Sequence, residues 1–152
     1  MDMITVRVVP ATEGGELYPQ YDRESKLLEV GSVVDQEWPY GFDVNGTIIF
    51  DVDREHILTN FELLIPRSYW KETDRVVFPK VATVGSLQIP VETLGRRTFN
   101  LPIGVGACPG KNKVLVIIGH KFEPVKFVQL SPQCIACLTQ KTELNGFYLN
   151  LI

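Results

Sequence analysis

Proline and glycine are spread along almost the whole chain, and this spacing limits what the chain can fold into. Ten prolines and twelve glycines occur between Pro10 and Gly146. Proline lacks a backbone N–H and glycine has low helix propensity, so both disfavour the interior of a helix. Their spacing seldom leaves room for a helix of three turns, and no sustained helical period of apolar residues stands out. The chain is therefore predicted to fold mainly as β-structure.

Short apolar runs with branched or bulky side chains lie between these turn formers. Runs of this kind, bounded by Gly, Pro, Asn and Asp, are typical of β-strands. The clearest strand candidates are residues 4–9, 47–50, 75–78 and 114–118. One helical turn is expected near residues 66–73.

Length and composition indicate one ordinary globular domain. The chain has 152 residues, of which 45% are hydrophobic and 22% are charged. Many short strands are stable either as two packed sheets or as a closed barrel. We predict a single all-β domain over residues 1–152, folded as an antiparallel β-sandwich or a partly closed barrel.

A weak internal similarity points to two hairpin-containing halves. Residues 56–65 resemble residues 142–151, because both place an apolar residue, a turn-prone residue and a Phe at the same spacing. Upstream, residues 26–28 resemble residues 113–115 at nearly the same separation. Duplication and the ordinary likeness of any two β-hairpins both account for this pattern.

Charge is distributed unevenly between the two halves of the chain. Residues 1–76 carry 15 acidic and 7 basic side chains, whereas residues 77–152 carry 3 acidic and 8 basic ones. Such polarity affects partners and self-association rather than fold. It favours a non-catalytic module that binds a protein partner through the acidic half. Self-association through the two oppositely charged halves is the alternative.

Residues 51–62 are rich in acidic side chains, which are candidates for binding a partner protein. The partner-binding candidates are the acids Asp51, Asp53 and Glu55, placed on an exposed hairpin turn, with the nearby aromatics Trp38 and Tyr40. The acids also fall at several positions of a calcium-binding loop. That loop requires a Gly where His56 stands, and it requires flanking helices where strands are expected. A solvated acidic hairpin is therefore the preferred interpretation.

Residues 21–65 resemble a small bacterial β-rich domain family of unknown function. The matching pattern is Tyr21-Asp22-x-Glu24, then Gly46 with Ile48-Ile49, then Asp51-x-Asp53-x-Glu55 followed by Leu58, Phe61-Glu62 and Leu64. The chain departs from it at His56 and Asn60, where glycines are usual, and at Lys26, where an acid is usual. His and Asn tolerate positive φ better than most residues. The resemblance implies a β-hairpin arrangement and carries no activity with it.

The cysteines and histidines offer one candidate metal site. Cys134 and Cys137 form a C-x-x-C pair, which Cys108 and His120 could complete as a set of four zinc ligands. On a strand, however, residues three apart point to opposite faces. Small buried hydrophobic side chains are therefore the preferred interpretation of Cys134 and Cys137.

Other chemistry finds little support in the sequence. Residues 104–112 depart from a phosphate-binding loop in glycine spacing, and a strand follows them instead of a helix. No catalytic residues and no cofactor are predicted, and a pI near 5.4 disfavours nucleic acid as a partner. A metal-dependent or small-ligand-binding β-barrel enzyme is kept as a further alternative. Three cysteines and the absence of a membrane-spanning apolar run favour a cytoplasmic setting.

Overall fold

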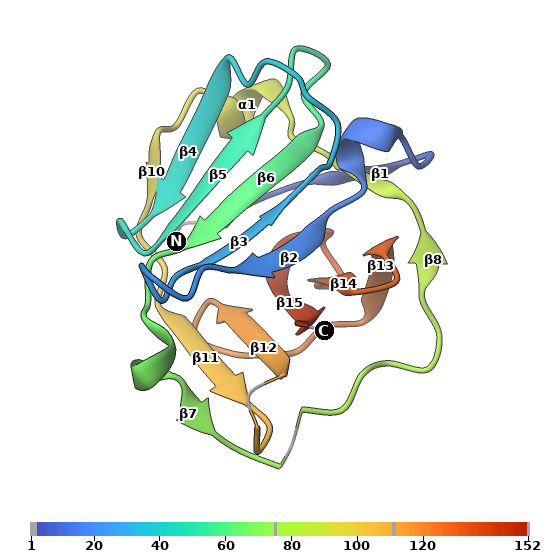
Figure 1. Ribbon diagram of the computed structural model, residues 1–152. Coiled ribbons are helices and arrows are strands. Elements are labelled where there is room, and N and C mark those ends of the chain that lie inside the picture. The colour runs from blue at the N-terminus through green and yellow to red at the C-terminus, as the bar shows by residue number, and fades with distance from the viewer. Residues whose placement is uncertain (1–2, 75, 111, 152) are drawn as a thin grey trace.

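The protein is a two-layered β-structure, seen in a computed structural model that describes residues 3–74, 76–110 and 112–151. The upper layer in Figure 1 is a six-stranded sheet, here called the N-sheet, in the order β10-β4-β5-β6-β3-β2. The lower layer is a seven-stranded sheet, the C-sheet, in the order β7-β11-β12-β15-β14-β13-β8. Both sheets are open at their edges, so the sandwich is found and the barrel is not.

The strands are short, as the spacing of prolines and glycines predicts. The N-sheet consists of β2 (Tyr18–Tyr21), β3 (Leu28–Gly31), β4 (Tyr40–Val44), β5 (Ile48–Val52), β6 (Leu58–Leu63) and β10 (Thr98–Phe99). The C-sheet consists of β7 (Lys71–Glu72), β8 (Thr83–Val84), β11 (Ile103–Ala107), β12 (Lys113–Ile118), β13 (Lys126–Ser131), β14 (Cys134–Leu138) and β15 (Leu144–Asn150).

Within the described residues, a third, two-stranded pairing and three short helical segments accompany the two large sheets. The small pairing joins β1 (Arg7–Val9) to β9 (Ser86–Gln88). The helical segments are η1 (Glu13–Gly15), η2 (Arg67–Tyr69) and α1 (Val91–Leu94). The segment η2 lies where the helical turn is predicted. No helix among the described residues is long and apolar enough to cross a membrane.

The two large sheets follow one plan. Strands β2 to β6 lie side by side in the order β2-β3-β6-β5-β4. Strands β11 to β15 lie side by side in the same relative order, β11-β12-β15-β14-β13. Equivalent residues lie 86 positions apart: Leu28 pairs with Leu63 as Val114 pairs with Leu149. The irregularity after Asp51 in β5 recurs after Cys137 in β14, again 86 positions later.

The internal similarity seen in the sequence falls on equivalent strands, β6 and β15. His56 and Thr142, which begin the two similar segments, both have positive φ, at 67° and 59°. Each turn is closed by the same backbone bond, because His56 N–H donates to the Asp53 carbonyl and Thr142 N–H donates to the Thr139 carbonyl, both at 3.0 Å. Lys26 also has positive φ, at 61°, whereas Asn60 lies inside β6.

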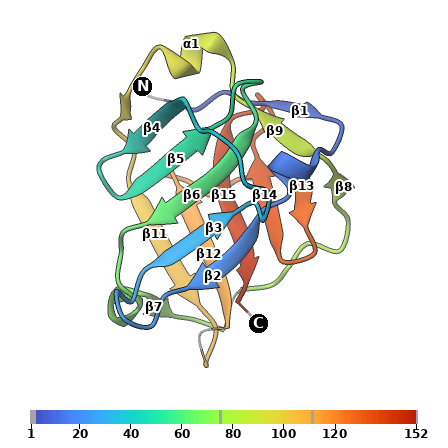
Figure 2. The ribbon, with the colours of Figure 1, turned by 45° about the horizontal axis from the view of Figure 1, so that its top comes forward.

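The hydrophobic core lies between the sheets, which Figure 2 shows one in front of the other. Alternate residues of each strand point inward, and the largest of them are aromatic. Phe61 of β6 and Phe147 of β15 are fully buried and stack with their ring centroids 4.3 Å apart. Phe50 contacts both rings, at 5.5 and 6.3 Å. One continuous cluster joins the two layers from Ile4 to Leu149.

The strand predicted over residues 75–78 is wrong for its described part. Arg75 lies outside the described residues, and residues 76–78 have no strand assignment. Val76, Phe78 and Ala82 instead pack on the outer face of the C-sheet beside Tyr148. We call residues 76–82 the strap. Its apolar side chains are buried against a sheet face rather than in a ladder, a contact that local sequence does not distinguish from a strand.

Candidate functional site

The outer face of the N-sheet carries a group of acids with no base among them. Strand alternation turns Glu29, Asp43, Asp51 and Glu62 outward, because their neighbours in β3 to β6 are buried in the core. The five strands β2 to β6 contain no Lys, Arg or His. We call this surface, with Ile49 at its centre, the acidic face.

Strand register brings these carboxylates together. Glu29 of β3 lies directly opposite Glu62 of β6, and Glu62 lies opposite Ile49 of β5. Ile49 in turn lies opposite Asp43 of β4. Like charges directly opposite on neighbouring strands destabilise a sheet. Sheet stability therefore gives no reason for the Glu29–Glu62 pair, which makes it a candidate for function.

The electrostatic environment reflects this crowding. Burial first, and then the negative charges of Glu62 and Asp51, raise the pKa of Glu29. Burial also raises the pKa of Asp51, partly opposed by a 3.0 Å hydrogen bond that the Asn60 amide donates to Asp51. A cation placed on this face would favour the charged form of both groups.

One oxygen of Asp43 lacks a partner among the described residues. Asp43 Oδ2 accepts a hydrogen bond from the Gly46 backbone N–H at 2.9 Å. Asp43 Oδ1 is buried, and no hydrogen bond from the described part of the chain reaches it. Buried polar atoms are nearly always hydrogen-bonded in folded proteins. This oxygen is therefore an unsatisfied acceptor beneath the acidic face, closed to solvent.

The candidates named from sequence are divided among three places. Asp51 lies on the acidic face, as described above. Glu55 is exposed on the turn after β5, and Tyr40 stands near it because its ring meets His56 at 5.1 Å. Trp38 is 45% exposed in the loop before β4. That loop is tied to the same turn by the ion pair of Glu37 with Arg54.

Asp53 requires a correction, because it is not on an exposed surface. It is 8% exposed, and its Oδ1 accepts hydrogen bonds from the backbone N–H groups of Glu55 and Ile57, both at 2.9 Å. Thr139 plays the equivalent part before β15, accepting from the Glu143 N–H at 3.2 Å. Asp53 therefore shapes the turn instead of standing on an exposed surface.

Sequence reasoning missed Glu29, Asp43 and Glu62 as members of this surface. They lie on three different strands, and only the register places them side by side. A signal was present in the composition of the strands, since the predicted extended runs of the first half contain acids and lack bases. Composition alone does not define a surface, because the strand pairing decides which of these acids lie side by side.

The four candidate zinc ligands do not form a site in this structure. Cys134 packs in the core between the sheets, whereas Cys137 packs on the outer face of the C-sheet beneath the strap. Cys108 is half-buried, and its thiol lies 3.0 Å from the Asn112 amide oxygen. His120 is exposed on the turn after β12. Among the described residues, no group of three His, Cys, Asp or Glu side chains could hold a metal ion.

The three thiols are expected to differ sharply in reactivity. Burial raises the pKa of Cys137 to about 12 and raises that of Cys134 as well, so neither forms the reactive thiolate readily. In native protein at mildly alkaline pH, Ellman's reagent should therefore label one thiol quickly, and Cys108→Ser should abolish that fast phase. All three should react after unfolding. Two fast thiols in the native protein would contradict the burial of the pair.

Comparison with known proteins assigns no family to this chain. No family model matches it, and no curated protein matches it. The resemblance of residues 21–65 to a bacterial β-rich domain family stays a prediction.

Proposed function

We propose that this protein is a non-catalytic binding module whose acidic face receives a basic segment of a partner protein. The observation that carries the proposal is the row of outward side chains Glu29, Glu62, Ile49 and Asp43, which contains three carboxylates and no cation. Lysine or arginine side chains laid across this row would offset the repulsion between Glu29 and Glu62. Complementary charge of this kind accelerates association and selects partners.

The centre of the face offers an apolar contact as well as charge. Ile49 is 37% exposed between Glu62 and Asp43. Interfaces commonly combine an apolar centre with a charged rim, because the centre contributes binding energy and the rim contributes selectivity.

The equivalent face of the C-sheet shows that the fold does not require these acids. Leu115 and Tyr148 pair there at the positions equivalent to Glu29 and Glu62, and Cys137 stands for Asp51. The same strand arrangement therefore accommodates apolar side chains at these positions. The acids of the N-sheet are better accounted for by binding than by folding.

The proposal can be tested with a fluorescein-labelled decalysine peptide as the probe. Fluorescence anisotropy at low salt should show saturable binding to the wild type, weakening as salt rises. The triple variant E29Q/D51N/E62Q should bind at least about tenfold more weakly. Binding should also weaken as acidification neutralises the face, and Glu29 and Asp51 protonate earlier than ordinary carboxyls because their pKa values are raised.

A matched variant separates the face from net charge. E13Q/E92Q/E123Q removes the same number of charges from exposed positions outside the face. It should bind decalysine nearly as well as the wild type. Equal losses in the two triple variants would mean that only net charge matters, and the proposed site would be rejected. If the wild type self-associates in a salt-dependent way and only E29Q/D51N/E62Q loses this self-association, the partner of the acidic face is a second copy of this chain and not a different protein.

A further inference from the structure

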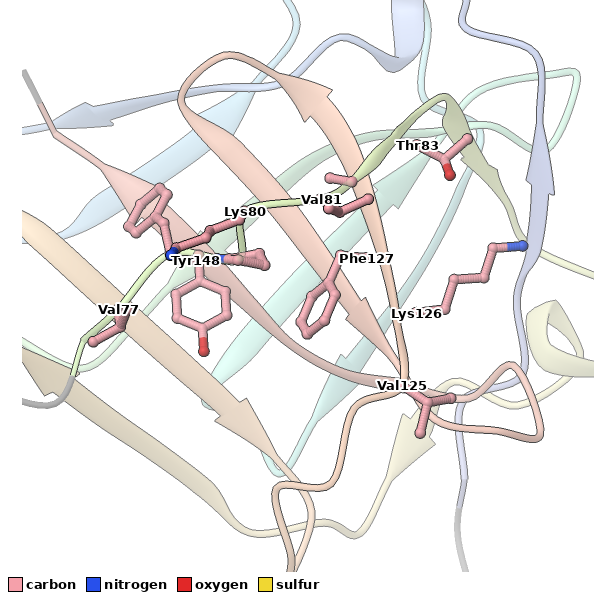
Figure 3. A pocket seen from close by; sticks show the side chains of 11 residues that line it. Val77, Lys80, Val81, Thr83, Val125, Lys126, Phe127 and Tyr148 are labelled. Carbon is pink, nitrogen blue, oxygen red and sulfur yellow. The ribbon is translucent and has the colours of Figure 1, made fainter.

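A groove runs along the outer face of the C-sheet, on the opposite side of the molecule from the acidic face. It has a volume of about 650 Å³ and lies between the strap, the start of β13 and Tyr148 of β15 (Figure 3). Pockets that hold small molecules commonly have volumes of about 300–1,000 Å³. The lining consists of residues 77–83, residues 125–127 and Tyr148.

The walls of the groove are apolar, and part of that apolar surface is open to solvent. Val77, Val81 and Val125 border it and are 67%, 82% and 64% exposed. Val77 and Val81 belong to the strap itself, and Val125 directly precedes β13. Exposed apolar side chains gathered at one concave place, rather than scattered singly, indicate a contact site.

Tyr148 supplies a polar group at the base of the groove. Its side chain is 8% exposed, and its ring centroid lies 5.3 Å from that of Phe78 and 6.4 Å from that of Phe127. Figure 3 shows the Tyr148 and Phe127 rings side by side, with the Tyr148 hydroxyl at the far end of its ring. No hydrogen bond of this hydroxyl is found among the described residues. Burial raises the pKa of Tyr148, which keeps the hydroxyl a donor.

The charge around the groove is positive. Lys80 and Lys126 belong to its lining and are exposed, while the Lys113 ammonium lies 6.0 Å from the centroid of the Phe78 ring. No acidic side chain belongs to the lining among the described residues. A ligand that fits must therefore combine an apolar body with a negative group.

We propose that this groove binds an amphipathic carboxylate, a small molecule with an aliphatic or aromatic body and one carboxyl group. The body lies against Phe78, Phe127 and the exposed valines, where its burial removes apolar surface from water. The carboxylate is attracted by Lys80, and Lys126, whose side chain extends away from the Phe127 ring (Figure 3), adds positive charge at the margin of the groove. The Tyr148 hydroxyl donates a hydrogen bond to a ligand oxygen. This site is independent of the acidic face and of the partner proposed for it.

Isothermal titration calorimetry with decanoate tests the proposal directly. Decanoate should bind saturably with one site per chain, and at least about tenfold more tightly than decyltrimethylammonium, which has the same chain length and the opposite charge. The variant K80Q/K126Q should lose most of that preference. The variant K121Q/K141Q removes two exposed lysines outside the groove lining and should keep the preference.

Tyr148→Phe tests the hydroxyl without removing the ring. It should weaken decanoate binding several-fold while leaving the urea denaturation midpoint nearly unchanged, because the aromatic packing is retained. Equal binding of decanoate and decyltrimethylammonium, or equal losses in the two lysine variants, would overturn the proposal. So would a wild-type dimer that Val81→Asp converts to a monomer, since the groove would then be an interface between copies.

Discussion

Replacing Phe147 by Ala should lower the free energy of unfolding by about 3–5 kcal/mol. Phe147 is fully buried, stacks on Phe61 at 4.3 Å and contacts Phe50 at 6.3 Å, so its ring joins β15 of the C-sheet to β5 and β6 of the N-sheet. Removal of the ring leaves a cavity between the layers. Neighbouring rings cannot fill that cavity without moving two sheets relative to each other, and this is why the upper part of the range is expected.

Urea denaturation followed by tryptophan fluorescence measures this loss, and Phe122→Ala provides the control. Phe122 is half-buried on the outer face, where water can replace part of its contact. Its truncation should cost clearly less than that of Phe147. A double-mutant cycle with Phe61→Ala should show coupling, because the two rings share one cavity. A loss for Phe147→Ala no larger than that for Phe122→Ala would contradict the central position of the stack.

Gly146→Ala should be the second strongly destabilising change, with a loss of about 3 kcal/mol. A Cβ at this position would lie 2.2 Å from the Val116 carbonyl oxygen on the neighbouring strand, and φ is 157°. The obstacle is backbone rather than a flexible side chain. The substitution must therefore push β12 away from β15, which weakens the pairing at the middle of the C-sheet.

Gly110→Ala is the matched control for this prediction. Gly110 has a φ of 88° with nothing within 4 Å of an added Cβ, so its substitution carries only the backbone cost of about 1–2 kcal/mol. Chemical denaturation of the two variants under the same conditions compares them. If Gly146→Ala proves no more costly than Gly110→Ala, the close approach of β12 and β15 at Val116 is not a real constraint.

Comparison with the N-sheet explains why a glycine is needed at position 146 of β15 and not at the equivalent position 60 of β6. Asn60 stands in β6 where Gly146 stands in β15, and the residue opposite Asn60 is Gly31. In the C-sheet the residue opposite Gly146 is Ile117. Each sheet therefore has one glycine in this pair of facing residues, but on opposite strands. In the N-sheet the glycine is Gly31, where an added Cβ would lie 2.3 Å from the Asn60 side-chain oxygen.

Part of the candidate site can be predicted from the amino-acid sequence alone. The excess of acids in the first half is a property of composition, and it points to Asp51. The same excess misplaces Asp53, whose neighbours in sequence look solvated, whereas its carboxylate turns back to the Glu55 and Ile57 backbone N–H groups. Local polarity does not reveal such a bond.

The groove cannot be predicted from the sequence. Phe78, Phe127 and Tyr148 are far apart in the chain. Phe127 and Tyr148 come together through the pairing of β13, β14 and β15, and Phe78 joins them because the strap lies on that face of the sheet. The strap itself has the branched, apolar composition of a strand. Its conformation depends on which sheet face is left for it to cover, and that is a property of the whole assembly.

The sequence by itself determined the class of fold, because prolines and glycines at short intervals exclude long helices and leave short alternating runs as the stable local structure. It also determined that residues 56–65 and 142–151 are alike. The tertiary structure alone decided that both lie at the centre of sheets with the same strand order, with Phe61 stacked on Phe147. It alone decided that Glu29 faces Glu62. The physical reason is that periodicity sets which side chains share a face of one strand, whereas register between strands depends on contacts distant in sequence.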